Sequence, residues 1–327
     1  MRPPSSRFAR EQRYTPRPAP SRWHMRTKRS VEQFALEMEI LAASDVGRGS
    51  AALQPIVVGD LLRACRSLLD APSLNVLIIT GFYIPRANPP AAETDGPIGA
   101  AQIAKLIELL GGRVSLMTDT LCMPVLSAVA TAANLRSSLV EVAPDGRGVY
   151  AWGQAPSEFR SLTHSIAIER PGRSIDGTYR NMRGEDISQH TAPLDDWFLK
   201  VGGTKIAIGD GGNEIGMGKI PDSVIDASIE NGAVIHCKID ADFLIVGGTS
   251  NWGAHALCTL VLRLASTRVS DSDANQLTSC EWHMKLLNAA VAAGAVDGAT
   301  RQHTATVDGL SNAQYTDTLT KIAQLQW

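Results

Sequence analysis

The chain has 327 residues, of which 44% are hydrophobic and 28 are glycine, enough to bury one large α/β core or two modest ones. No apolar run reaches the roughly 20 residues that a membrane-spanning helix needs, so we expect no membrane segment. The net charge is −2, and the five cysteines form no closely spaced pair. This cysteine pattern fits a reducing compartment and argues against a cysteine-rich zinc site.

The first 30 residues differ in composition from the rest. They carry eight arginines and one lysine against one acid, a charge of +8, so residues 31–327 carry −10. This Pro-, Ser- and Arg-rich leader has little to bury, and we expect it to be disordered. Two origins stay open: a transit peptide, which implies a mitochondrial location, or a start placed too early, with Met25 as the true start of a cytoplasmic protein. Residues 31–327 are predicted to form one α/β domain, whose acidic charge predicts no nucleic-acid partner.

Strand and helix patterns alternate along this domain. Apolar runs predict strands at residues 74–80, 114–118, 138–142, 165–169, 205–208 and 243–247. Helical spacing predicts helices at residues 97–110, 122–134, 193–200, 252–266 and 281–293. The first strand, helix and second strand form a βαβ unit with parallel pairing and a right-handed crossover. The predicted fold is an open, mostly parallel, Rossmann-like sheet with helices on both faces.

A glycine-rich loop with two carboxylates follows the predicted strand at residues 205–208. Residues 208–219 read Ile-Gly-Asp-Gly-Gly-Asn-Glu-Ile-Gly-Met-Gly-Lys. The spacing does not match a phosphate-binding Walker A loop, because Asn213 stands where that motif needs its first glycine. It does not match a dinucleotide-binding loop either, because Glu214 stands where that motif needs a small residue. Asp210 and Glu214 would repel a bare anion. The loop is therefore predicted to bind an amine, a cation or a protonated carboxyl group.

Segments rich in polar residues and glycine follow most of the predicted strands, and they supply the candidate site residues. These residues are Thr80, Gly81, Glu93, Thr94, Asp95, Gly96, Asp119, Glu169, Arg170, Gly211, Gly212, Asn213, Ser250, Asn251 and Trp252, together with Asp210, Glu214 and Lys219. The carboxyl ends of parallel strands meet at one edge of a sheet, which is where open α/β sheets bind ligands. A site with this many carboxylates suits acid/base chemistry or the binding of a hard cation.

These motifs resemble the D-glutamate cyclase-like family. The resemblance rests on residues 80–82, 93–97, 166–172, 208–219, 250–253, 294–298 and 306–309. It implies a hydro-lyase, a carbon–oxygen lyase, that converts D-glutamate to 5-oxo-D-proline with loss of water. The implied partner is a small amino or hydroxy acid, and no oligomeric state is implied.

The cyclisation assigns roles to these residues. The α-amine must lose a proton and attack the γ-carboxyl group, so we expect Asp210 and Glu214 to serve as base and acid and Lys219 or Arg170 to hold the α-carboxylate. The remaining strand-end residues are predicted to bind substrate, and the glycine-rich backbone to stabilise the oxyanion. Mg²⁺ or Mn²⁺ held by Asp95, Asp119 and Asp210 would polarise the γ-carboxyl group equally well. The sequence does not choose between the two schemes.

Two other functions remain open at this stage: a metal-dependent hydrolase or phosphate-handling enzyme acting on a small acid, and a non-catalytic domain that binds a small acid. Individual residues also have structural interpretations. Asp95 and Asn251 are typical helix caps, Trp252 is a typical core aromatic residue, and Arg170 is placed to form a structural ion pair. Lys219 is equally consistent with a solvated surface lysine.

Overall fold

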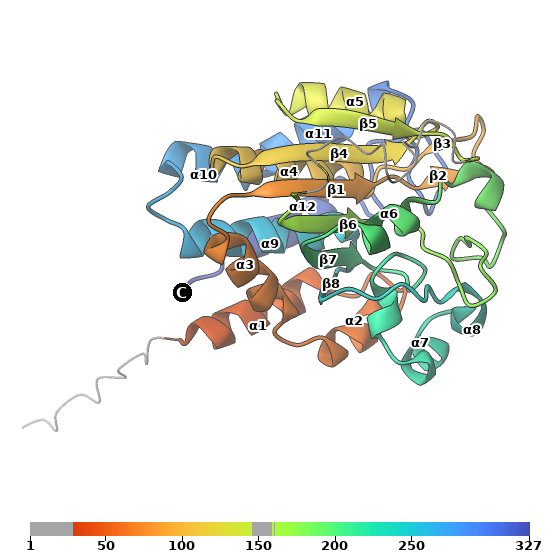
Figure 1. Cartoon of the computed structure of the whole chain (residues 1–327), viewed down its shortest axis with the longest axis horizontal. Helices are drawn as coiled ribbons and strands as arrows, with labels where there is room; N and C mark the ends of the chain where they lie inside the picture. The colour runs from red at the N-terminus through yellow and green to blue at the C-terminus, as the bar shows by residue number, and fades with distance from the viewer. Residues whose placement is uncertain (1–28, 146–158, 160) are drawn as a thin grey trace, which may run out of the picture.

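The computed structural model describes residues 29–145, 159 and 161–327. A six-stranded parallel sheet forms its centre, in the order β5-β4-β1-β6-β7-β8 (Figure 1). The strands are β1 (Asn75–Thr80), β4 (Arg113–Asp119), β5 (Ser138–Val142), β6 (His164–Ile168), β7 (Thr204–Gly209) and β8 (Phe243–Val246). The predicted Rossmann-like fold and all six predicted strands are confirmed. The predicted leader lies outside the described residues except for its last two.

The strand order reverses between β1 and β6. The first three strands of the sheet extend outward from β1 on one side, and the last three extend from β6 on the other. Loops that leave the two halves at this switch point diverge to opposite faces and open a crevice at the carboxyl edge of the sheet. The fold therefore places a ligand site beside the ends of β1 and β6.

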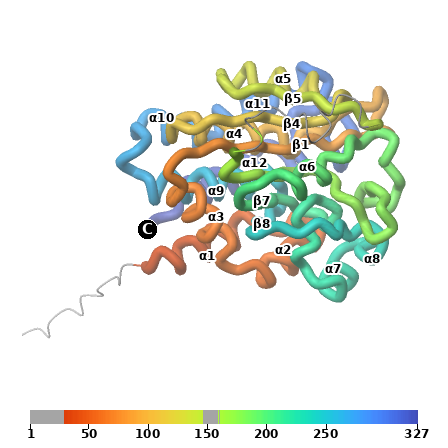
Figure 2. The backbone as a smooth tube through the Cα atoms, in the orientation of Figure 1, coloured from red at the N-terminus to blue at the C-terminus, as the bar shows by residue number. Residues whose placement is uncertain are grey.

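Helices cover both faces of the sheet (Figures 1 and 2). They are α1 (Val31–Ala42), α2 (Ser50–Leu53), α3 (Asp60–Asp70), α4 (Pro97–Leu109), α5 (Met123–Ala132), α6 (Leu194–Lys200), α7 (Asp222–Ser228), α8 (Gly232–Ile235), α9 (Ser250–Leu264), α10 (Asp271–Leu277), α11 (Cys280–Ala292) and α12 (Asn312–Gln324). The five predicted helices correspond to α4, α5, α6, α9 and α11. Across the described ranges, no helix is long and apolar enough to cross a membrane.

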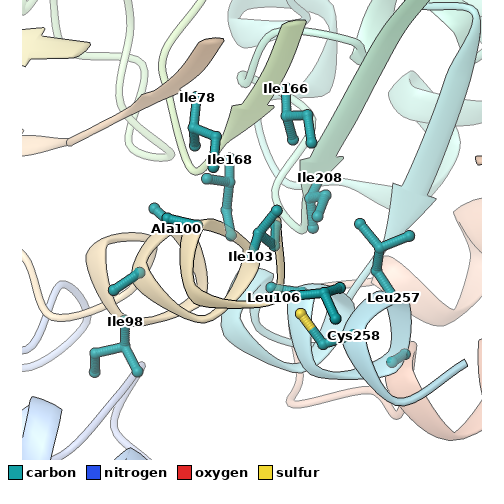
Figure 3. Packing of buried hydrophobic residues seen from close by; sticks show 14 of the residues in the cluster. Ile78, Ile98, Ala100, Ile103, Leu106, Ile166, Ile168, Ile208, Leu257 and Cys258 are labelled. Atoms are coloured by element: carbon teal, nitrogen blue, oxygen red, sulfur yellow. The ribbon is translucent and has the colours of Figure 1, made fainter. Parts of the chain in front are cut away.

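Alternate residues of each strand enter different cores because successive side chains point to opposite faces. Ile78, Ile168 and Ile208 pack against α4 and α9 (Figure 3). Leu77 and Ile79 instead join the core under α6. Burial on both faces explains why these strands are continuous apolar runs rather than alternating ones.

A short hairpin lies between β1 and α4. Its strands, β2 (Tyr83–Ile84) and β3 (Ala91–Ala92), have two residues each and pair antiparallel. The hairpin carries Phe82 and Glu93 to the carboxyl edge of the sheet, where both line the cavity described next.

Candidate active site

A cavity of about 380 Å³ lies at the carboxyl edge of the sheet, within the size range of small-molecule sites. Its wall combines five parts of the chain: the turn before α2, the β2–β3 hairpin, the loop after β6, the segment between β7 and β8, and the segment between α11 and α12. The described lining residues are Gly47, Arg48, Gly49, Phe82, Ile84, Pro85, Arg86, Glu93, Glu169, Asn181, Met182, Arg183, Asp210, Asn213, Ser228, Glu230, Gly298, Ala299, Arg301 and Asp308.

Six carboxylates meet at the inner end of this cavity, and we call them the carboxylate cluster: Glu93, Asp95, Glu169, Asp210, Glu214 and Asp308. One ligand atom from each of Glu169, Asp210 and Glu214 lies within 4.8 Å of the others, and the same holds for Asp95, Asp210 and Asp308. Asp210 belongs to both groups. It is therefore the carboxylate that links the two groups.

The glycine-rich loop folds back on itself and presents Glu214 beside Asp210. One oxygen of Glu214, Oε1, accepts hydrogen bonds from the backbone N–H groups of Asp210 (3.1 Å) and Gly211 (2.7 Å). Gly216 then turns the chain away with a φ of +99°, and a Cβ there would lie 2.0 Å from that of Ala207. Only glycine fits such a position. The loop geometry thus fixes one oxygen of Glu214 and leaves the other for the site.

Arg48 reaches the cluster from the turn before α2. Its Nη2 donates to Oδ2 of Asp210 (2.6 Å) and to Oδ2 of Asp308 (2.5 Å). The carboxylate of Asp45 holds this turn by accepting from the backbone N–H groups of residues 47–49. Asp45 and the two glycines that flank Arg48 indicate a turn, but no sequence pattern places the arginine in the site.

Burial and repulsion by neighbouring carboxylates raise the pKa values of several members of the cluster. Burial raises the pKa of Glu93 and of Glu169 well above its usual value, and neighbouring carboxylates add to both shifts. Burial has the same effect on the pKa of Asp210, although Arg48 opposes it. The pKa of Asp95 rises to about 7, again chiefly through burial. One arginine does not neutralise six acids, so the cluster holds protons or a further cation near neutral pH.

Several oxygens in the site lack partners. Oε1 of Glu93, Oδ1 of Asp210, Oδ1 of Asn213 and Oε2 of Glu214 are buried without a hydrogen-bond partner in the described part of the chain. Leaving a buried acceptor unsatisfied costs about 1–3 kcal/mol. Such atoms are expected where a ligand, an ion or water completes the site.

Comparison with known proteins supports the resemblance that the motifs indicated. Residues 38–323 match the family model described as D-glutamate cyclase-like, C-terminal. The chain belongs to this family. It is also 34% identical over 278 residues to human D-glutamate cyclase, mitochondrial, a match that covers 80% of this chain. The chain spans only 42% of that relative's length.

The D-glutamate cyclase-like chain uses several of the predicted binding residues as helix caps. Oδ1 and Oδ2 of Asp95 accept from the backbone N–H groups of Asn251 (2.9 Å) and Ser250 (2.8 Å) at the start of α9. In return, Oδ1 of Asn251 accepts from Gly96 (3.1 Å) and Gly99 (2.8 Å) at the start of α4. This exchange locks the two helices together and fixes Asp95 within the cluster.

Other predicted residues lie around the cluster. The hydroxyl of Ser250 donates to Glu169 at 2.5 Å, and Asn213 lines the cavity. Thr94 donates to the carbonyl of Thr306. Further from the cavity, Trp252 stacks on Tyr315 and donates to its carbonyl oxygen. Ser250, Asn213 and Thr94 thus support the site, whereas Trp252 packs in the core.

The glycines and the buried threonine shape the backbone around these groups. Gly96 has a φ of +92°, and a Cβ there would lie 2.6 Å from that of Glu169. Thr80 is buried beside it with its hydroxyl unpartnered among the described residues. The carbonyl of Gly81 accepts from Arg170, and that of Gly212 from the backbone of Cys237. These positions let the loops approach one another closely.

The two cations expected to hold an α-carboxylate are engaged elsewhere. Lys219 pairs with Asp60 at 2.9 Å and donates to the carbonyl of Asp242. Arg170 is buried, pairs with Asp119 at 2.6 Å, and donates to the carbonyls of Gly81 and Ala192. Neither is among the described residues that line the cavity. The cations on the cavity wall are instead Arg48, Arg86, Arg183 and Arg301.

The residues suited to a metal ion differ in part from the predicted set. Asp95 and Asp210 come together, but Asp119 is in neither group of convergent carboxylates, and Asp308 joins them instead. Arg48 already bridges Asp210 and Asp308. The group of Glu169, Asp210 and Glu214 keeps two unpartnered oxygens among the described residues and suits Mg²⁺ or Mn²⁺, which prefer oxygen ligands.

Proposed function

We propose that this chain is a lyase that binds D-glutamate in the cavity and converts it to 5-oxo-D-proline with loss of water. The observation that carries the proposal is the carboxylate cluster, with its raised pKa values and unpartnered oxygens, in a chain of the D-glutamate cyclase-like family. The chain spans less than half of its human relative, so catalysis by this part alone is itself part of the proposal. Its location, cytoplasmic or mitochondrial, stays a prediction.

The reaction needs a proton acceptor and a proton donor close together. A new bond forms between the α-nitrogen and the carbon of the γ-carboxyl group, one carbon–oxygen bond of that group breaks, and the two protons lost by the α-ammonium leave with that oxygen as water. We assign Asp210 and Glu214 to the first proton transfer, because Asp210 Oδ1 and Glu214 Oε2 are unpartnered within the described chain. Carboxylates around a substrate ammonium also stabilise its binding.

The electrophile must be neutralised, because a carboxylate resists attack by an amine. We assign this task to Glu169 and Glu93, because burial raises their pKa values well above the usual range and so favours the protonated form. Mg²⁺ or Mn²⁺ held by Glu169, Asp210 and Glu214 would supply the same polarisation of the γ-carboxyl group. The two schemes differ in whether chelation stops the reaction.

An NMR time course tests the proposal. The purified chain is incubated with D-glutamate, with Mg²⁺, with Mn²⁺ and with a chelator, and the signals of 5-oxo-D-proline are followed against an enzyme-free control, since glutamate cyclises slowly unaided. We expect catalysed product. Loss of activity with the chelator, restored by metal, supports the metal scheme, and activity that survives the chelator supports proton donation.

The absence of catalysed product from a folded sample under every condition contradicts the proposed activity. Thermal stabilisation by D-glutamate in the same sample would then favour a binding domain, because a ligand that binds only the folded state raises the melting temperature.

A further inference from the structure

Three arginines line the cavity in addition to Arg48: Arg86, Arg183 and Arg301. They come from three separate parts of the chain: Arg86 from the hairpin after β1, Arg183 from the loop after β6 and Arg301 from the loop after α11. Arg86 pairs with Glu185 at 2.9 Å. Arg183 donates from Nη2 to the carbonyl of Ala299, which joins its loop to the one that carries Arg301.

Of these three arginines, Arg301 is the best candidate to bind a ligand. Its Nε is buried without a hydrogen-bond partner, and Arg301 forms no ion pair, among the residues that the structure describes. A buried guanidinium nitrogen without an acceptor is costly. The backbone of Arg301 also has a φ of +60°, a conformation that is uncommon for residues other than glycine.

Asp297 holds the loop that presents Arg301. Its side chain is fully buried and accepts from the backbone N–H groups of Ala299 (3.0 Å), Thr300 (2.8 Å) and Gly309 (2.8 Å). The same loop carries Asp308 into the carboxylate cluster. One rigid loop therefore supplies a cation and an anion to the same cavity.

We propose that Arg301, assisted by Arg183, binds the α-carboxylate of the substrate and restricts the site to small amino diacids with a free α-carboxylate. The proposal rests on the proposed function and assigns the role that Lys219 and Arg170 do not fill. The substrate ammonium is drawn to the carboxylate cluster, which repels the α-carboxylate on the same carbon. The cationic wall gives that carboxylate a partner and leaves the γ-carboxyl group beside the cluster.

This arrangement predicts a separation of KM from kcat. The α-carboxylate keeps its charge throughout the cyclisation, so its contact with Arg301 is equal in the bound substrate and the transition state. Arg301→Gln should raise KM for D-glutamate about 10- to 100-fold, the loss expected for a charged hydrogen-bonded contact, and change kcat less than about threefold. Arg301→Lys should recover part of the affinity, and Arg268→Gln, at an exposed arginine, is the matched control.

A second substrate identifies the group that Arg301 contacts. D-Isoglutamine keeps the α-amine and the γ-carboxyl group but replaces the α-carboxylate with a neutral amide. Wild type should prefer D-glutamate to D-isoglutamine by about 10- to 100-fold in kcat/KM, and Arg301→Gln should lose most of that preference. An Arg301→Gln variant with the KM and the preference of wild type overturns the proposal.

Thermal stabilisation keeps this test separate from that of the proposed function. If wild type forms no product from D-glutamate, the proposed function fails. The α-carboxylate subsite is then tested by comparing the melting temperatures of wild type, Arg301→Gln and Arg268→Gln with and without D-glutamate or glutarate. Stabilisation that only Arg301→Gln loses supports the anion subsite. No stabilisation of wild type, or equal stabilisation of all three proteins, overturns it.

Discussion

Replacing Asp210 with asparagine separates the catalytic role of the carboxylate cluster from its effect on stability. The substitution keeps the size of the side chain and removes its charge. It weakens the contact with Nη2 of Arg48, now 2.6 Å, but Arg48 keeps its bond to Asp308. It also removes the repulsion between Asp210 and the nearby oxygens of Glu169 and Glu214, which lie within 4.8 Å.

The lost attraction to Arg48 and the lost repulsion by Glu169 and Glu214 change the free energy of unfolding in opposite directions. At an effective dielectric constant of about 20, two unit charges 4.8 Å apart repel by roughly 3.5 kcal/mol, and a pair 2.6 Å apart attracts by roughly 6 kcal/mol. Burial raises the pKa of Glu169, which favours its neutral form and so reduces its repulsion of Asp210. We expect Asp210→Asn to change the free energy of unfolding by less than about 2 kcal/mol, a melting-temperature shift of no more than roughly 5 °C.

The same substitution should abolish measurable turnover, because loss of a general base costs about 10²- to 10⁴-fold in rate and loss of a metal ligand a similar amount. The assay is the initial rate of 5-oxo-D-proline formation, with the melting temperature measured on the same preparation. Asp317→Asn, in a surface ion pair with Lys321, is the matched control and should leave both quantities unchanged. Wild-type kcat/KM in a folded Asp210→Asn protein would refute the assigned role.

Three further predictions concern stability. Burial raises the folded-state pKa of Glu93, so ionisation of Glu93 destabilises the folded protein as pH rises above the unfolded pKa of about 4.3. The melting temperature of Glu93→Gln relative to wild type should therefore increase between pH 5 and pH 8, whereas that of Glu281→Gln, on an exposed helix face, should not. A melting-temperature difference between Glu93→Gln and wild type that stays constant with pH would contradict this assignment. Asn251→Ala removes the side-chain acceptor of the Gly99 N–H and one of the two acceptors of the Gly96 N–H, which keeps Oδ1 of Asp95. The substitution should cost about 1–3 kcal/mol in chemical denaturation, against little change for Asn275→Ala on the surface; equal midpoints would remove the capping role. Burial lowers the pKa of His255 in the folded protein to about 4. The stabilisation that comes from keeping His255 neutral is therefore fully present above the unfolded pKa of about 6.5 and is lost as pH falls through about 4. An NMR titration that shows His255 becoming charged near pH 6.5 in the folded protein would disprove this prediction.

The strands were predictable from sequence because burial on both faces leaves continuous apolar runs. The chain between β1 and α4 was not, since strands of two residues are too short to show a period. Helix α3 also went unpredicted, although Leu61, Ala64 and Leu68 all point to the core. Its start after a glycine, without a side-chain cap, gave no boundary signal.

The site was predictable where its residues directly follow strands. Asp210 and Glu169 lie within two residues of a strand end and both reach the cavity. Lys219 does not, because the backbone N–H groups of Gly216 and Gly218 bind the carbonyl of Ile239 and carry the chain away from the edge. Arg48 reaches the site from 162 residues before Asp210. No local spacing reveals such a contact, and the same applies to Arg301.

A crystal structure of the Asp210→Asn variant with D-glutamate tests the proposed site most directly, because this variant should bind the substrate without measurable turnover. We expect D-glutamate in the cavity, with its amine and γ-carboxyl group beside the carboxylate cluster and its α-carboxylate toward Arg301. Electron density for D-glutamate bound outside this cavity, or bound with its α-carboxylate among the acids, would contradict it.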